Sequence, residues 1–192
     1  MIKGVIFDMD GTITKPYIDW KALRGEIGVS DGSMIMDHIA CLEGAERRRA
    51  TEILERQEEE ASVNSELNVG VKELLDYLKD RGIRTCLVTN NNRRSIEIVL
   101  TKHNLIFDFA LSREDGRIKP SADLIVKALK RLDLRKEEVV FIGDGRLDME
   151  ASAQAGIRGI YLTNASPAFE HPLQVDALFE TIDLIETWSR TE

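Results

Sequence analysis

The feature that most constrains the fold of this chain is a set of short runs in which every residue is apolar. Four such runs occur, at residues 5–7, 86–88, 139–142 and 160–162. A strand that is apolar on both faces must be covered on both faces, as in a parallel sheet between two layers of helices. The runs therefore predict a buried parallel sheet.

The stretches between these runs have helical spacing. Apolar side chains recur three and four residues apart at residues 71–78, 96–100 and 124–132. Gly82 is expected to stop the first of these helices and Pro120 to open the third. The alternation of strands and helices predicts the α/β class, with a doubly wound parallel-sheet (Rossmann-like) core.

Residues 15–67 break the alternation, because they contain no run that looks like a strand. Trp20, Leu23 and Ile27 share one helix face, and residues 45–64 are charged and helix-prone. We therefore predict a helical insert directly after the first strand.

The insert also predicts the domain boundaries. We expect a core of residues 1–14 and 68–192 and an inserted helical unit of residues 15–67. Within the insert, the acidic run Glu58-Glu59-Glu60 is expected to be a solvated helix face.

The acidic composition limits the class of partner. The chain has 34 acidic and 26 basic residues and a net charge of -8, which disfavours binding to a nucleic-acid backbone. No segment approaches the ~20 apolar residues of a membrane span. Cys41 and Cys86 form no CxxC, which indicates a reducing compartment, and Cys86 is expected to be buried. We expect a cytoplasmic protein that binds neither nucleic acid nor membrane.

Two carboxylates follow the first apolar run. Asp8 and Asp10 are two residues apart, so in an extended chain their side chains point to the same side, and Gly11 permits a sharp turn beyond them. Repulsion between them raises one pKa, which suits a nucleophile beside an acid/base. The alternative is a loop with two solvated carboxylates.

A hydroxyl and a run of amides follow the second apolar run. Thr89 and the backbone amides of Asn90 and Asn91 are good donors to phosphate oxygens. The alternative is that this Asn-rich segment only caps the next helix.

A lysine precedes the proline that opens the third helix. Pro120 favours an extended conformation at Lys119, and the helix dipole disfavours a cation there. Lys119 is therefore expected to compensate nearby negative charge, or else to be an ordinary surface lysine.

The fourth motif contains two further carboxylates. Asp144 ends the third apolar run, and Asp148 follows four residues later in the first turn of a helix, so both can reach one cation. A dinucleotide fingerprint would need a glycine in place of Asp148, and the chain has no P-loop motif.

Together the four motifs resemble the haloacid dehalogenase (HAD) superfamily, and the insert resembles the small helical cap of its phosphoglycolate-phosphatase-like branch. The resemblance implies that Asp8 is the nucleophile, forming an aspartyl-phosphate, and that Asp10 protonates the leaving oxygen and then activates water. It implies that Thr89 and Lys119 hold the phosphoryl oxygens.

The resemblance also implies a metal site. Its ligands would be the carboxylates of Asp8 and Asp144 and the carbonyl of Asp10, with Asp148 in support. Because every candidate ligand is an oxygen, Mg²⁺ is the expected ion.

The expected function is therefore a magnesium-dependent phosphatase acting on a small phosphorylated metabolite, a phosphate monoester. The alternative is a phosphomutase of the same superfamily, similar to β-phosphoglucomutase. A true dehalogenase is disfavoured by Asp10, and a receiver domain by the insert. Thr89, Asn90 and Lys119 are expected to bind the substrate phosphate. Lys21 and Arg24 share a face of the insert, and one of them, Arg24 by preference, is expected to meet the other end of the substrate; the alternative is a solvated helix face. The oligomeric state, monomer or dimer, is not predicted.

Overall fold

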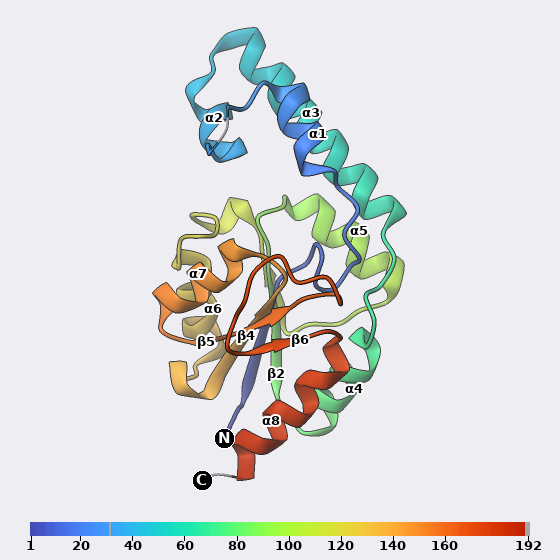
Figure 1. Cartoon of the computed structure of the whole chain (residues 1–192), viewed down its shortest axis with the longest axis vertical. Coiled ribbons are helices and arrows are strands. Elements are labelled where there is room, and N and C mark those ends of the chain that lie inside the picture. Colours follow the sequence, from blue (N-terminus) through green and yellow to red (C-terminus); the bar gives the residue numbers. More distant parts are fainter. Residues whose placement is uncertain (31, 191–192) are drawn as a thin grey trace.

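A six-stranded parallel sheet forms the centre of the molecule (Figure 1). The structure is a computed structural model that describes residues 1–30 and 32–190. Its strand order, β3-β2-β1-β4-β5-β6, is that of a doubly wound sheet, which confirms the predicted fold class. The strands are β1 (Gly4–Phe7), β2 (Arg84–Val88), β3 (Phe109–Leu111), β4 (Val139–Gly143), β5 (Arg158–Leu162) and β6 (Gln174–Val175).

Helices cover both faces of the sheet. The helices are α4 (Val71–Asp80), α5 (Arg93–His103), α6 (Asp123–Leu132), α7 (Arg146–Ala155) and α8 (Thr181–Arg190). Alternate residues of β1 enter opposite core layers: Val5 and Phe7 pack toward α4, α5 and α8, and Ile6 packs toward α6 and α7. The described residues also form the short 3-10 helices η1 (Arg113–Asp115), η2 (Lys136–Glu138) and η3 (Leu178–Glu180).

The start of α6 differs from the sequence expectation. The helix begins at Asp123, three residues after Pro120. The amide of Ser121 instead bonds the carbonyl of Ile118 at 3.0 Å, so Pro120 lies in a turn before the helix.

Three helices between β1 and α4 stand apart from the sheet layers, at the top of Figure 1. They are α1 (Trp20–Ile27), α2 (Ile35–Cys41) and α3 (Gly44–Asn64). They share a separate apolar cluster of Leu23, Ile39, Ala50, Ile53 and Leu54.

The acidic run of α3 is only partly solvated. Glu59 and Glu60 are exposed as expected, but Glu58 is 2% exposed. The expectation that Glu58 is solvated was wrong, because its carboxylate pairs with Arg113 of η1. The spacing of residues within α3 gives no sign of this partner.

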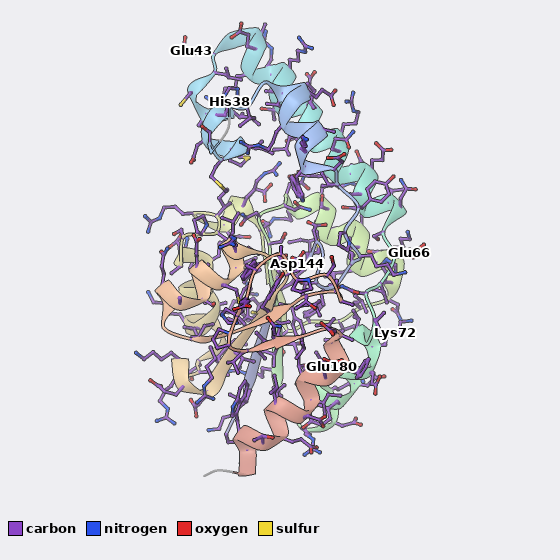
Figure 2. The ribbon with its side chains drawn as sticks, in the orientation of Figure 1. His38, Glu43, Glu66, Lys72, Asp144 and Glu180 are labelled. Atoms are coloured by element: carbon purple, nitrogen blue, oxygen red, sulfur yellow. The ribbon has the colours of Figure 1, made fainter. Side chains whose placement is uncertain are left out.

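Two neighbouring antiparallel segments join the helices α1–α3 to the α/β core. The amide of Lys15 donates to the carbonyl of Glu66 at 2.9 Å, and the amide of Asn68 donates to the carbonyl of Ile13 at 2.9 Å. Figure 2 shows Glu66 at this junction. Lys102 of α5 adds bonds to carbonyls at the end of α3, so the two helices are held side by side.

Within the described residues, helices are too short or too polar to cross a membrane. Cys86 is buried in the sheet, as expected, and Cys41 is exposed.

Candidate active site

Three carboxylates meet where the strand order of the sheet reverses. Asp8 follows β1, Asp144 follows the neighbouring β4, and Asp148 lies in the first turn of α7. Each offers an oxygen within 4.8 Å of the others. Figure 2 shows Asp144 within the α/β core, on the side that faces the helices α1–α3. Parallel sheets bind ligands at this position, outside the carboxyl ends of their strands.

The turn after β1 is shaped to admit the carboxylate of Asp144. Gly11 has φ +80°, and a Cβ at this position would overlap Asp144. The amides of Ile13 and Thr14 bond the carbonyl of Met9 at 2.8 and 2.9 Å, which closes the turn. A glycine is therefore required both by the backbone and by the approach of Asp144.

Lys119 is the cation of this cluster. Its ammonium group bonds the carboxylate of Asp8 and lies 2.6 Å from that of Asp148. Lys119 is 3% exposed, and its charge lies over the ring of Phe141. Burial alone would lower the pKa of Lys119, but Asp148 and Asp8 outweigh burial and raise it, so the lysine is charged.

The backbone of Lys119 is fixed by Asn90. The Asn90 side chain donates to the carbonyl of Lys119 at 3.0 Å and accepts from its amide at 2.8 Å. The Asn90 side chain thus orients the lysine. The expectation that Asn90 binds the substrate phosphate concerned its backbone amide, and Asn90 borders the cavity described below.

Asp10 is held by a residue of the loop after β2. The Asn91 side chain donates to Asp10 at 2.5 Å, and the Asn91 amide donates to the Thr89 hydroxyl at 3.1 Å. Burial, and next the charges of Asp8 and Glu58, raise the pKa of Asp10 to about 7. A carboxyl with a pKa near neutrality is suited to give and take a proton.

The pKa values of the other two carboxyls at the strand ends are also raised. Burial raises the pKa of Asp8 to about 6, against the lowering effect of Lys119. Burial and the charge of Asp8 raise the pKa of Asp144 to about 8. One lysine does not neutralise this cluster, so it retains affinity for a further cation.

The chemistry of these donors fits a hard divalent cation. The carboxylate oxygens of Asp8, Asp144 and Asp148 lie close together, and the Asp148 carboxylate is itself oriented by the Gly145 amide at 3.0 Å. An all-oxygen set of this kind is typical of magnesium sites.

A cavity of about 440 Å³ separates these carboxylates from the helices α1–α3. Arg24 and Glu58 border it from α1 and α3, and Arg113 borders it from η1. Arg113 donates to Glu58 at 2.5 Å, and Glu58 also accepts from Asn92 at 2.8 Å.

The structure thus brings together all the residues expected from the four motifs, with Arg24 across the cavity. Sequence reasoning missed Glu58 and Arg113. For Asn91 it named only the backbone amide, as a donor to phosphate, whereas this amide donates to the Thr89 hydroxyl and the side chain holds Asp10. Arg113 follows β3, which has three residues and is too short to be recognised from its pattern.

Comparison with known proteins identifies similar chains. The sequence profile of the haloacid dehalogenase-like hydrolases matches residues 2–156. A haloacid dehalogenase-like hydrolase domain-containing protein of Arabidopsis thaliana is 27% identical, over 97% of this chain and 84% of that protein. An N-acetylmuramic acid 6-phosphate phosphatase of Pseudomonas putida is 28% identical, over 82% of this chain and 81% of that protein.

Solved structures with a similar fold are also found. The crystal structure of a predicted phosphoglycolate phosphatase from Haemophilus somnus superposes with a TM-score of 0.73 at 19% identity. The match covers 96% of this chain and 98% of that one, so it includes the helices α1–α3 as well as the sheet.

Proposed function

Since the chain belongs to the haloacid dehalogenase-like hydrolases, we propose that it is a magnesium-dependent phosphatase. It hydrolyses small organic phosphate monoesters in two steps, through an aspartyl-phosphate on Asp8. The observation that carries the proposal is the placement of Asp8 beside the charged Lys119, with carboxylate oxygens of Asp144 and Asp148 within 4.8 Å.

In the first step Asp8 acts as the nucleophile and Asp10 as the acid. An oxygen of Asp8 attacks phosphorus, forming an O–P bond as the bond from phosphorus to the leaving oxygen breaks. Asp10, whose pKa is about 7, gives its proton to that oxygen. In the second step Asp10 takes a proton from water, the water oxygen bonds to phosphorus, and Asp8 is released with inorganic phosphate.

Thr89 and Lys119 hold the phosphoryl oxygens during both steps. The Thr89 hydroxyl accepts from the Asn91 amide, so its own hydrogen can be donated to a phosphoryl oxygen. The Lys119 charge offsets the negative charge that two carboxylates and a phosphate bring together.

The metal would be held by the carboxylates of Asp8 and Asp144 and the carbonyl of Asp10, with Asp148 in support. Bound Mg²⁺ would neutralise charge on the phosphoryl group and orient it for in-line attack.

We also propose that residues 15–67 form a cap over a core of residues 1–14 and 68–192. The separate apolar cluster of α1–α3 and the cavity beneath it support this division. Arg24 borders the cavity from the cap, which is where the organic part of a substrate would lie.

An assay of 4-nitrophenyl phosphate tests the proposal. We expect release of inorganic phosphate in Mg²⁺, loss of activity in EDTA, and recovery when Mg²⁺ is restored. Activity that persists in EDTA would overturn the metal role. Conversion of a hexose 1-phosphate to the 6-phosphate without phosphate release would favour the phosphomutase alternative.

A further inference from the structure

The cap side of the cavity is mostly apolar. Leu54 is buried, and the other apolar side chains of this wall are partly or largely exposed toward the space below. The wall consists of Trp20, Met34, Ile35, Met36 and Leu54. Such a surface gains free energy by covering an organic group and offers a charged group no replacement for its water.

Arg113, which borders the cavity from η1, is already neutralised. Arg113 is largely buried, and its guanidinium donates to the carboxylate of Glu58 at 2.5 Å. Glu55 lies 3.9 Å from the same guanidinium. The pair of Glu58 and Arg113 therefore presents polar atoms to the cavity without a net positive charge.

Arg24 is also engaged with protein groups. Its guanidinium donates to the carbonyl oxygens of Ser30 and Ser33, at 2.7 Å each. These bonds join α1 to the backbone of Ser30 and Ser33. Two donor nitrogens of Arg24 are thus directed to the backbone.

Negative charge exceeds positive charge around the cavity. Among the described residues that border it, the cations are Arg24, Arg113 and Lys119. The acidic residues outnumber them: Asp8, Asp10, Glu58, Asp144 and Asp148. With Asp10 protonated, as in the first step, the excess is a single negative charge. One divalent ion more than offsets it, and the dianionic substrate phosphate makes the site negative again. A second anionic group on the substrate would therefore be repelled.

We propose that the leaving group of the substrate is an uncharged organic group, and that Glu58 sets this preference by neutralising Arg113. The inference rests on the proposed phosphatase activity and deepens it by naming the substrate class. Glu58 acts on specificity through Arg113, as a positioning residue that keeps the guanidinium from a substrate anion.

Two matched esters test the preference directly. The probes are 4-carbamoylphenyl phosphate and 4-carboxyphenyl phosphate, which have similar size and differ by one charge. For the wild-type protein with Mg²⁺ we expect kcat/KM for the carbamoyl ester to be at least about tenfold higher, the effect of about one pKa unit of like-charge repulsion.

Variants of adjacent glutamates test the role of Glu58. Glu58→Gln keeps the shape of the side chain but frees the charge of Arg113, so the preference should fall about tenfold. Glu59→Gln is the matched control, because Glu59 is exposed on the same helix, and should leave the preference unchanged. If Glu58→Gln does not fold, Arg113→Gln should move the preference in the opposite direction.

The outcomes separate this inference from the proposed function. Hydrolysis of both esters with equal or better use of the carboxylate ester would overturn the inference and leave the phosphatase activity standing. An unchanged preference in folded Glu58→Gln would overturn the role of Glu58. Failure to hydrolyse either ester in Mg²⁺ would overturn the proposed function and the inference with it.

Discussion

Lys119 is the residue that makes the acidic cluster compatible with a folded protein. Its ammonium group is buried between the carboxylates of Asp8 and Asp148. A buried charge without a partner is very costly, so each member of this group depends on the others. The sequence anticipated a lysine that compensates negative charge, but the dipole argument assumed a helix start at Lys119, and α6 begins only at Asp123.

Replacement of Lys119 should therefore affect both activity and stability. We expect Lys119→Met to lower kcat/KM for an aryl phosphate on the order of 10²–10³-fold, the usual effect of losing one preorganised charge. The free energy of unfolding should fall by about 3–5 kcal/mol at pH 8, as for other buried pairs that lose one partner.

Lys127→Met is the matched control for this prediction. Lys127 pairs with Asp123 at 3.0 Å, but both side chains are partly solvated, and such pairs contribute about 0–1 kcal/mol. Steady-state kinetics and urea unfolding measure both variants. Equal effects of the two substitutions would contradict the role assigned to Lys119.

At the scale of elements, the site depends on the turns that follow β1 and β4. These strands are neighbours in the sheet, with Phe7 opposite Ile142, so Asp8 and Asp144 leave the sheet side by side. The amide of Asp8 also bonds the carbonyl of Ile142 at 2.9 Å. The strand pairing thus places the carboxylates before any ligand is present.

The turn at Gly11 offers a direct test of this arrangement. We expect Gly11→Ala to abolish most activity, because its Cβ would overlap Asp144 and because φ is +80°. Backbone strain alone should lower the free energy of unfolding by about 1–3 kcal/mol.

Gly25→Ala provides the control for the turn. Gly25 lies within α1 and a Cβ there would meet no atom within 4 Å, so alanine should be neutral or stabilising. Activity assays and thermal unfolding report both variants. Full activity in Gly11→Ala would contradict the requirement for close approach.

The sequence predicted the elements that have strong patterns. Four strands and the helices between them follow from hydrophobic runs, and α5 begins at Arg93, directly after its cap Asn92. The strands β3 and β6 have three and two residues, too few to show a pattern. They are held by pairing with their neighbours in the sheet rather than by local preference.

The site was predictable where side chains follow strands and not where they meet across the fold. Parallel strands bring their carboxyl ends together, so a motif at each end implies a cluster. The contact of Glu58 with Arg113 joins α3 to η1, 55 residues apart, and no periodicity encodes it. The same holds for Asn90, whose partner Lys119 is 29 residues away.

At the scale of the whole molecule, the carboxyl cluster links stability to pH and to metal. The pKa values of Asp8, Asp10 and Asp144 are about 6, 7 and 8, above their ordinary value of 3.8. Between the ordinary pKa of 3.8 and the raised pKa of each group, the folded protein binds more protons than the unfolded chain. These groups therefore stabilise the fold below about pH 4, and this contribution is lost as pH rises toward 8.

Magnesium should reverse this loss. The ion binds the ionised carboxylates, so at pH 6 it must displace protons and at pH 8 it displaces few. We expect Mg²⁺ to raise the free energy of unfolding more at pH 8 than at pH 6, by on the order of 1–2 kcal/mol. The rise in Tm caused by Mg²⁺ should therefore be larger at pH 8.

Differential scanning calorimetry with and without Mg²⁺ measures this linkage. Asp144→Asn is the control, since it removes one expected ligand and should lose most of the increment at both pH values. An equal increment at pH 6 and pH 8 in the wild-type protein would contradict the link between the raised pKa values and the metal.

The central claim is that Asp8 carries the phosphoryl group, and acid-quench mass spectrometry tests it most directly. In Asp10→Asn, a substrate with a good leaving group such as 4-nitrophenyl phosphate can still phosphorylate Asp8, but no base activates water. We predict a phosphorylated peptide at Asp8 in this variant, and none when Asp8→Asn is added. Phosphate release by Asp8→Asn, or phosphorylation at another residue, would contradict the account.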